Sequence, residues 1–165
     1  MNDLAERVAL AFIAAINRHD VDELAGLMTP GHNFVDSLGN VVEGREKMRA
    51  GWAGYFGTVP DYLITVVETF CEGGVVVLLG VAEGSYAPDG ELKPENRWST
   101  PVALRANVTD GLVAEWRVYA DNVPLRGLMR NGLCSSALAR LCGAATNGPG
   151  LRSAGAIRPQ ARSSA

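Results

Sequence analysis

The sequence predicts one α+β domain in which a strongly bent antiparallel sheet wraps around helices that cover one face. Three observations support this fold class. Apolar residues recur at helical spacing through roughly the first 60 residues. From Asp61 onward the spacing changes to strand alternation, and four strand candidates follow one another between turn residues. With 165 residues and 47% hydrophobic composition, the chain is long enough for one sizeable core.

The first helix is predicted for about residues 2–18. Leu4, Val8, Phe12 and Ile16 recur every four residues and therefore form one apolar stripe along a helix. A stripe of this length indicates that the helix packs against a large apolar surface, which the predicted sheet would supply.

A short helix and a short strand come next. Asp20 followed by Glu23 is a capping-box pattern, so a second helix is expected to begin there and to end at "TPG". From residue 32 onward the chain reads as a strand, whose alternation puts His32, Phe34 and Asp36 on one face. A carboxylate beside a phenyl ring suggests either a cap for the turn that follows or a functional group in an apolar pocket. Both roles stay open at this point.

The third helix and the four long strands complete the predicted domain. "GREKMRAGWAGYFGTVP" is typical of a helix that ends at Gly57 and Pro60. The strand candidates are separated by Gly-Gly, by a ten-residue segment with glycine and proline, and by Asp110-Gly111. The last two of these segments are strong hairpin signals. The candidates are residues 61–74, 74–86, 97–111 and 112–121.

The strand "VVVLLGVA" is apolar on both faces, so the outer face of the sheet should also be covered. The simplest cover is a second copy of the chain, and we expect a homodimer through the outer sheet face.

Charge divides the sequence into a domain of residues 1–129 and a tail of residues 130–165. The tail carries five arginines and no acid, is rich in Ala, Gly and Ser, and is predicted to be largely disordered. Its arginines are dispersed and the preceding domain is acidic, so nucleic acid is not an expected partner.

Several other classes of protein are disfavoured. The sequence has no run of about 18 apolar residues and no signal-peptide pattern at its start, which predicts a cytoplasmic protein without membrane partners. Cys71, Cys134 and Cys142 form no C-x-x-C pair, and the two histidines lack a matching ligand motif. We therefore expect no metal, no disulfide and no cofactor.

One segment carries a family resemblance. "FIAAINRHDVDELAGLMTPGHNFVDSLGNVVEGREKM", together with the order of elements up to "WRVYAD", resembles the nuclear transport factor 2-like superfamily. The similarity is to the branch with ketosteroid isomerases and SnoaL-type polyketide cyclases, over about residues 4–128. It implies a cone-shaped α+β barrel with a pocket inside, in a fold that serves enzymes and binding modules alike.

The resemblance also carries over some site residues. Ketosteroid isomerases place their general base in an acid-x-x-Gly strand end, which "DSLG" matches at Asp36. The positions of their two oxyanion donors match Phe12 and Ala103 in this sequence. The positions of the Asp-Arg-Asp set in the epoxide-hydrolase branch match Val118, Pro101 and Ala103. None of these side chains can do the family chemistry, and each lost donor costs about 3 kcal/mol of transition-state stabilisation. Both mechanisms are therefore disfavoured.

The predicted site is an apolar pocket for a flat, small, hydrophobic molecule, with acid–base groups at its edge. Asp36 is the predicted general base, His32 its partner on the same face, and Asp121 a further acid–base candidate; polyketide cyclases of this fold use a cavity aspartate that corresponds to either Asp36 or Asp121. Tyr62 and Tyr119 are possible hydrogen-bond donors. The expected substrate-binding residues are Phe12, Phe34, Trp52, Phe56, Tyr62, Trp116, Val118 and Tyr119.

Two functions follow from this reading. One is a cofactor-independent isomerase, cyclase or lyase in which Asp36 moves a proton beside a carbonyl group. The alternative is a non-catalytic module of the same fold that binds a hydrophobic ligand or dimerises.

Overall fold

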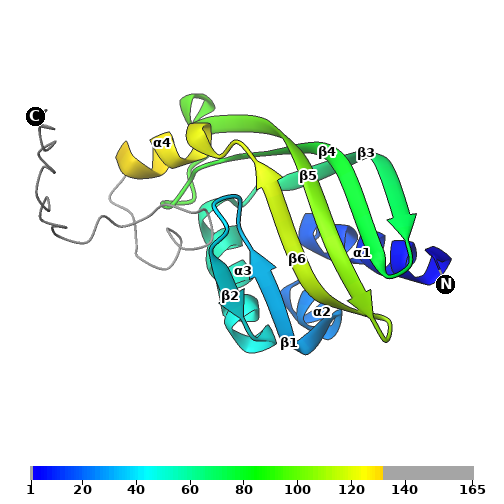
Figure 1. The fold of residues 1–165 in the computed structure, drawn as a ribbon. Coiled ribbons are helices and arrows are strands. Elements are labelled where there is room, and N and C mark those ends of the chain that lie inside the picture. The colour runs from blue at the N-terminus through cyan, green and yellow to red at the C-terminus, as the bar shows by residue number, and fades with distance from the viewer. Residues whose placement is uncertain (1, 132–165) are drawn as a thin grey trace, which may run out of the picture.

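A computed structural model describes residues 2–131 and confirms the α+β fold class (Figure 1). Its helices are α1 (Asn2–Asn17), α2 (Val21–Gly26), α3 (Arg45–Thr58) and α4 (Val123–Asn131), with a 3-10 turn η1 (Pro94–Asn96). Its strands are β1 (Met28–Val35), β2 (Val41–Glu43), β3 (Leu63–Glu72), β4 (Val75–Ser85), β5 (Arg97–Thr109) and β6 (Leu112–Ala120). They form one sheet in the order β2-β1-β6-β5-β4-β3, which curls over α1–α3 without closing.

Helix α1 forms where its apolar stripe predicts it. Val8, Phe12 and Ile16 are buried against the sheet, whereas Leu4 at the helix start is 50% exposed. Asn17 at the other end fixes the helix to β3, because its side chain donates to the Ile64 carbonyl at 2.9 Å and accepts from the Ile64 N–H at 2.8 Å. The predicted cap of α2 is also present, since the Asp20 carboxylate accepts the Glu23 N–H.

Strand β1 is longer than the predicted strand, and its pairing differs from the all-antiparallel expectation. It pairs antiparallel with β2 and parallel with β6, with Phe34 opposite Trp116. No hairpin joins β1 to β6, so no tight turn forces them to run in opposite directions. This parallel pair joins the N-terminal strands to the long meander β3–β6.

Strand β3 contains a bulge where it runs beside Gly80 of β4. The register shifts between Val66 and Glu68 in β3, which inserts one extra residue opposite Gly80 of β4. A Cβ atom at Gly80 would lie 2.0 Å from the Thr65 carbonyl oxygen, so only glycine fits there. The bulge and this glycine together let the two strands curl around α1.

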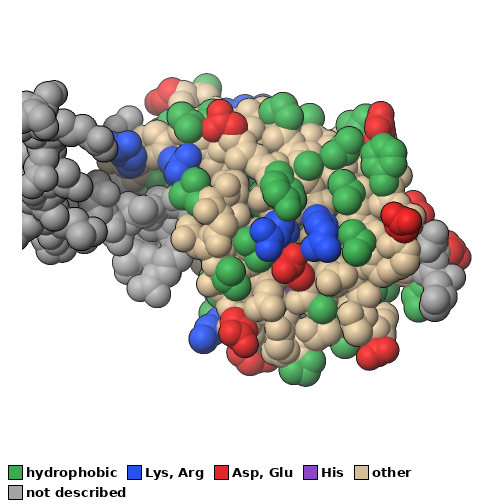
Figure 2. All heavy atoms as spheres, viewed as in Figure 1, with side chains coloured by type: hydrophobic (Ala, Val, Ile, Leu, Met, Phe, Trp, Pro, Cys, Tyr) green, Lys and Arg blue, Asp and Glu red, His purple; other side chains and the backbone are tan. Residues whose placement is uncertain are grey.

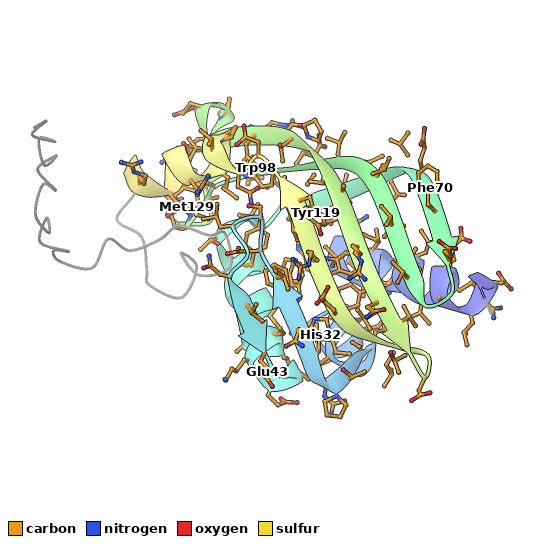
Figure 3. The ribbon with its side chains drawn as sticks, in the orientation of Figure 1. His32, Glu43, Phe70, Trp98, Tyr119 and Met129 are labelled. Carbon is orange, nitrogen blue, oxygen red and sulfur yellow. The ribbon has the colours of Figure 1, made fainter. Side chains whose placement is uncertain are left out.

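On the outer face of the sheet, hydrophobic side chains surround a group of charged ones (Figure 2). Phe70 and Tyr119, labelled in Figure 3, are 56% and 53% exposed. Strand β4, which pairs with β3 on one side and with β5 on the other, adds half-buried valines and a leucine to this face. Arg105 and Arg117 both contact the Glu115 carboxylate, at 2.8 and 3.3 Å, and form the charged centre of this face.

Helix α4 was not predicted. It follows β6 and buries Leu125 and Met129, so the expected domain boundary at residue 129 falls inside a helix. The remaining tail, with Cys134 and Cys142, lies outside the described residues. Among the helices of the described part, none is long and apolar enough to cross a membrane.

Candidate functional site

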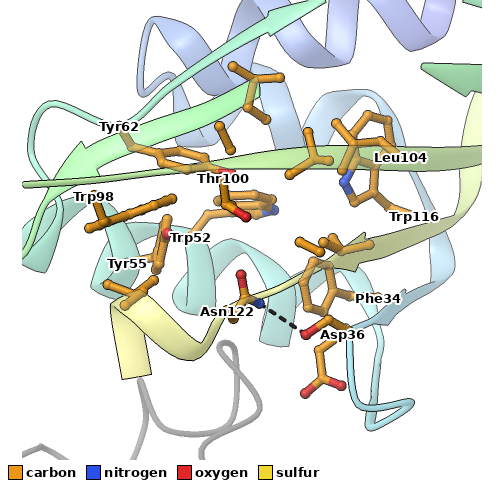
Figure 4. A pocket seen from close by; sticks show the side chains of 17 residues that line it. Phe34, Asp36, Trp52, Tyr55, Tyr62, Trp98, Thr100, Leu104, Trp116 and Asn122 are labelled. Atoms are coloured by element: carbon orange, nitrogen blue, oxygen red, sulfur yellow. Dashed lines mark hydrogen bonds between the residues drawn. The ribbon is translucent and has the colours of Figure 1, made fainter. Parts of the chain in front are cut away.

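A pocket lies between the inner face of the sheet, helix α3 and the start of α4 (Figure 4). Its free volume is about 50 Å³. The lining residues are Phe34, Asp36, Ser37, Trp52, Tyr55, Tyr62, Ile64, Ala82, Trp98, Thr100, Val102, Leu104, Trp116, Val118, Ala120, Asn122 and Leu125.

A continuous group of aromatic rings forms one wall. Trp52 and Tyr55 lie one turn apart on α3, with ring centroids 6.0 Å apart in an edge-to-face arrangement. Tyr55 meets Tyr62 at 5.0 Å, and Tyr62 meets Trp98 at the start of β5 at 5.9 Å. Edge-to-face contacts of this kind are favourable and directional, so each ring holds its neighbour in place.

Asp36 lies at the end of β1 and is 3% exposed. Its Oδ1 accepts the N–H groups of Leu38 and Asn40 at 2.8 and 2.9 Å, and its Oδ2 accepts Asn40 Nδ2 at 2.8 Å. An ionised carboxylate has about four acceptor positions, so most of its capacity is used within the turn. In Figure 4 the carboxylate points into this turn, away from the aromatic rings. The turn-capping role is therefore present in the structure.

Asp36 is nevertheless the one carboxylate among the described lining residues, and these include no lysine, arginine or histidine. The rim beside it is tied together by Asn122, whose Nδ2 donates to the Ser37 hydroxyl at 3.0 Å (Figure 4). This bond joins the turn after β1 to the segment that leads into α4.

His32 is fully buried behind the pocket wall and is not among the lining residues. Its Nδ1 must carry the proton, because it bonds the Val113 carbonyl at 2.8 Å and a carbonyl can only accept. Nε2 has no partner among the described residues. Burial lowers the pKa of His32, partly opposed by the Val113 hydrogen bond and the Glu115 charge. The shared strand face thus does not bring His32 into the pocket with Asp36.

Asp121 and Tyr119 also lie away from the pocket. Asp121 is exposed, and its carboxylate accepts the Val123 N–H at 2.9 Å at the start of α4. Tyr119 is opposite Ala103 on the outer face, because strand alternation turns it away from its neighbours Val118 and Ala120.

The predicted binding residues divide into two groups. Phe34, Trp52, Tyr62, Trp116 and Val118 line the pocket, whereas Phe12, Phe56 and Tyr119 do not. The first two of these exceptions are core residues: Phe12 packs on Trp116 at a centroid distance of 4.6 Å, and Phe56 stacks on His19 at 4.3 Å. The His19 ring also bonds the Tyr62 carbonyl, which is a structural role.

The two β5 residues of the family matching do not line the pocket. Pro101 and Ala103 face outward, and Thr100, Val102 and Leu104 face the pocket. A shift of one residue moves every side chain of a strand to the other face. Neither Val102 nor Leu104 can donate a hydrogen bond, and the Thr100 hydroxyl donates to the Asp121 carbonyl at 3.0 Å.

Sequence reasoning missed other lining residues. Alternation along residues 97–106 would have found Trp98 and Thr100 if the register had been known. Asn122 and Leu125 carried no signal, because the helix that places Leu125 was not recognised.

The curled sheet, the helices beneath it and the aromatic pocket define a protein of the nuclear transport factor 2-like and ketosteroid isomerase-like fold. Residues 9–116 match the SnoaL-like domain, and the chain belongs to this family. No curated protein matches the sequence.

Solved structures show the same fold at low identity. A candidate SnoaL-like polyketide cyclase from Jannaschia sp. CCS1 is 21% identical, with a TM-score of 0.64 and coverage of 86% of this chain and 93% of that chain. An epoxide hydrolase from M. tuberculosis is 17% identical, with a TM-score of 0.65 and coverage of 80% and 93%. A ketosteroid isomerase-like protein from Catenulispora acidiphila, in complex with trimethylamine, is 17% identical, with a TM-score of 0.61 and coverage of 78% and 93%.

Proposed function

We propose that the protein binds a small, flat, mainly hydrophobic molecule in this pocket. The observation that carries the proposal is the composition of the wall: six aromatic side chains with aliphatic neighbours and few polar groups. Ligand sites in proteins typically have such linings. A free volume of about 50 Å³ is several times what one water needs, and it favours a small, compact ligand.

Blocking the pocket tests this proposal. Ala120 lines the pocket, so Ala120→Phe would fill it, whereas Ala53→Phe adds the same side chain at an exposed position of α3. We expect native mass spectrometry of protein from its own source to show a retained small molecule in the wild type and in Ala53→Phe. Ala120→Phe should lack it. A ligand retained equally by both variants would place binding elsewhere, and an empty wild type would argue against the proposal.

A second candidate function is cofactor-independent proton transfer on a bound carbonyl compound, as an isomerase, cyclase or lyase. It is favoured by the position of Asp36 as the one carboxylate among the described lining residues. As a general base, Asp36 would use the acceptor position that its turn leaves open. Since His32 and Asp121 do not line the pocket, this proposal gives them no contact with the substrate.

Turnover by the Asp36→Asn variant tests the catalytic candidate. Loss of turnover with ligand affinity nearly unchanged is the expected result, because asparagine keeps the shape and cannot take up a proton. Unchanged turnover would leave ligand binding as the function.

We also propose that the chain forms a homodimer through the outer sheet face. The exposed rings of Phe70 and Tyr119 and the half-buried apolar residues of β4 support this assembly, because large apolar areas are rarely left in water.

A further inference from the structure

Two polar atoms in the pocket wall have no hydrogen-bond partner among the described residues. The indole Nε1 atoms of Trp52 and Trp98 are buried and bond no acceptor among residues 2–131. Each tryptophan is 6% exposed, and both rings stand in the wall shown in Figure 4. Trp116 also lines the pocket.

Unpartnered indole groups of this kind are unusual. The indole N–H can only donate, and a buried tryptophan normally finds an acceptor for it. Two such donors in one small pocket therefore point to an acceptor that comes from outside the chain.

The two rings are also held in fixed positions. Trp52 meets Phe34 edge-on at 6.2 Å and stacks on Phe56 at 5.4 Å, while Trp98 lies against Tyr62 at 5.9 Å. Packing on these neighbours prevents the indoles from turning to another acceptor. Donors that are held in place before binding favour ligands whose acceptors match them.

The charges around the pocket limit the ligand further. The described lining residues hold no cationic side chain, and Asp36 would repel an anion. Two N–H donors disfavour a cation beside them. A neutral molecule with strong acceptor atoms is the class that satisfies both conditions.

We infer that the Trp52 and Trp98 N–H groups bind carbonyl-type oxygens of a neutral ligand and make the pocket select such molecules over hydrocarbons of the same shape. This inference rests on the proposed ligand-binding function and adds two specificity-determining residues to it.

The test compares 1-indanone with indane, two compact bicyclic molecules that differ in one carbonyl group. For the wild type we expect indanone to bind about 10-fold more tightly, as one or two well-placed hydrogen bonds allow. Trp52→Phe and Trp98→Phe keep an aromatic ring without the donor, and each should reduce this preference several-fold. Phe34→Leu is the matched control, because it removes a ring of the same wall that carries no donor, and it should weaken both probes alike and leave their ratio unchanged.

Nitrogen-15 NMR of the unmodified protein provides a second measurement that needs no variant. The chain has three tryptophans and therefore three indole N–H signals. Indanone should shift two of them downfield, and indane should not. Equal affinity for the two probes, without these shifts, would overturn the inference and leave the ligand-binding function intact. Failure of both probes to bind would overturn the two proposals together.

Discussion

At the scale of single residues, the observed capping role of Asp36 and its proposed role as a base conflict in their demands. As a cap it must hold three hydrogen bonds within its turn, and as a base it must offer a free lone pair to a substrate. Asn40 is the residue that decides between them, because it supplies both a backbone and a side-chain donor.

Exchanging the two residues separates these roles. Asp36→Asn places two amide groups face to face, so it should lower the free energy of unfolding by about 1–2 kcal/mol. The double variant Asp36→Asn, Asn40→Asp restores an amide–carboxylate pair with reversed polarity and should recover most of this stability in urea denaturation. If Asp36 is the base, turnover stays absent in the double variant. Recovery of turnover together with stability would show that the turn alone was needed.

His32 gives the molecule a pH dependence. Burial lowers its pKa below the ordinary value of 6.5, so the unfolded chain takes up a proton at a higher pH than the folded chain does. The free energy of unfolding should therefore fall as the pH drops below about 6.5 toward the lowered pKa.

Urea denaturation between pH 7.5 and 5 measures this slope. His32→Asn keeps a donor near the Val113 carbonyl and removes the titrating group, so its profile should be flatter than that of the wild type. Equal slopes in the two proteins would assign the pH dependence to other residues.

Residue positions were predictable from the sequence where one local rule decided them. Alternation predicted that His32, Phe34 and Asp36 share a face of β1, and all three side chains are buried, as is Val35 between them. It could not say that Phe12 covers His32 or that Asp36 turns toward Asn40, because both depend on contacts beyond the strand.

At the scale of elements, the sheet owes its bend to the bulge in β3 and the glycine opposite it. Gly80→Ala would press a methyl group against the Thr65 carbonyl, and we expect a loss of about 1–3 kcal/mol of stability from overpacking. Gly54→Ala is the control, because a Cβ atom there meets nothing within 4 Å and alanine favours the α3 helix by about 0.5–1 kcal/mol. Thermal unfolding should shift in opposite directions for the two variants, and a neutral Gly80→Ala would mean that the strands can separate freely.

Elements with strong periodicity, caps or hairpin turns were predicted well, and α4 was not. Its nine residues contain Gly127, a poor helix former, although Pro124 is well tolerated in the first turn; the tertiary packing of Leu125 and Met129 stabilises the helix. The pairing of β1 with β6 also lay beyond local rules, since 81 residues separate His32 from its partner Val113.

At the scale of the whole molecule, the curled sheet has two faces with different uses. The inner face supplies the core and, between α3 and α4, the pocket. The outer face carries exposed apolar side chains around a charged centre, and covering it would not block the pocket, whose lining is on the inner face. Assembly and ligand binding can therefore be tested independently.

Light scattering after size-exclusion chromatography tests the assembly. The 17.5 kDa chain should elute with the mass of two copies, and Tyr119→Lys should shift it to one copy, because the new charge joins Arg105 and Arg117 on the face that would be buried. Leu38→Lys changes a side chain of similar exposure, 50% against 53%, in the turn after β1 and should leave the dimer intact. A dimer that survives Tyr119→Lys would place the interface elsewhere. A monomeric wild type would mean that this apolar face stays open to another partner.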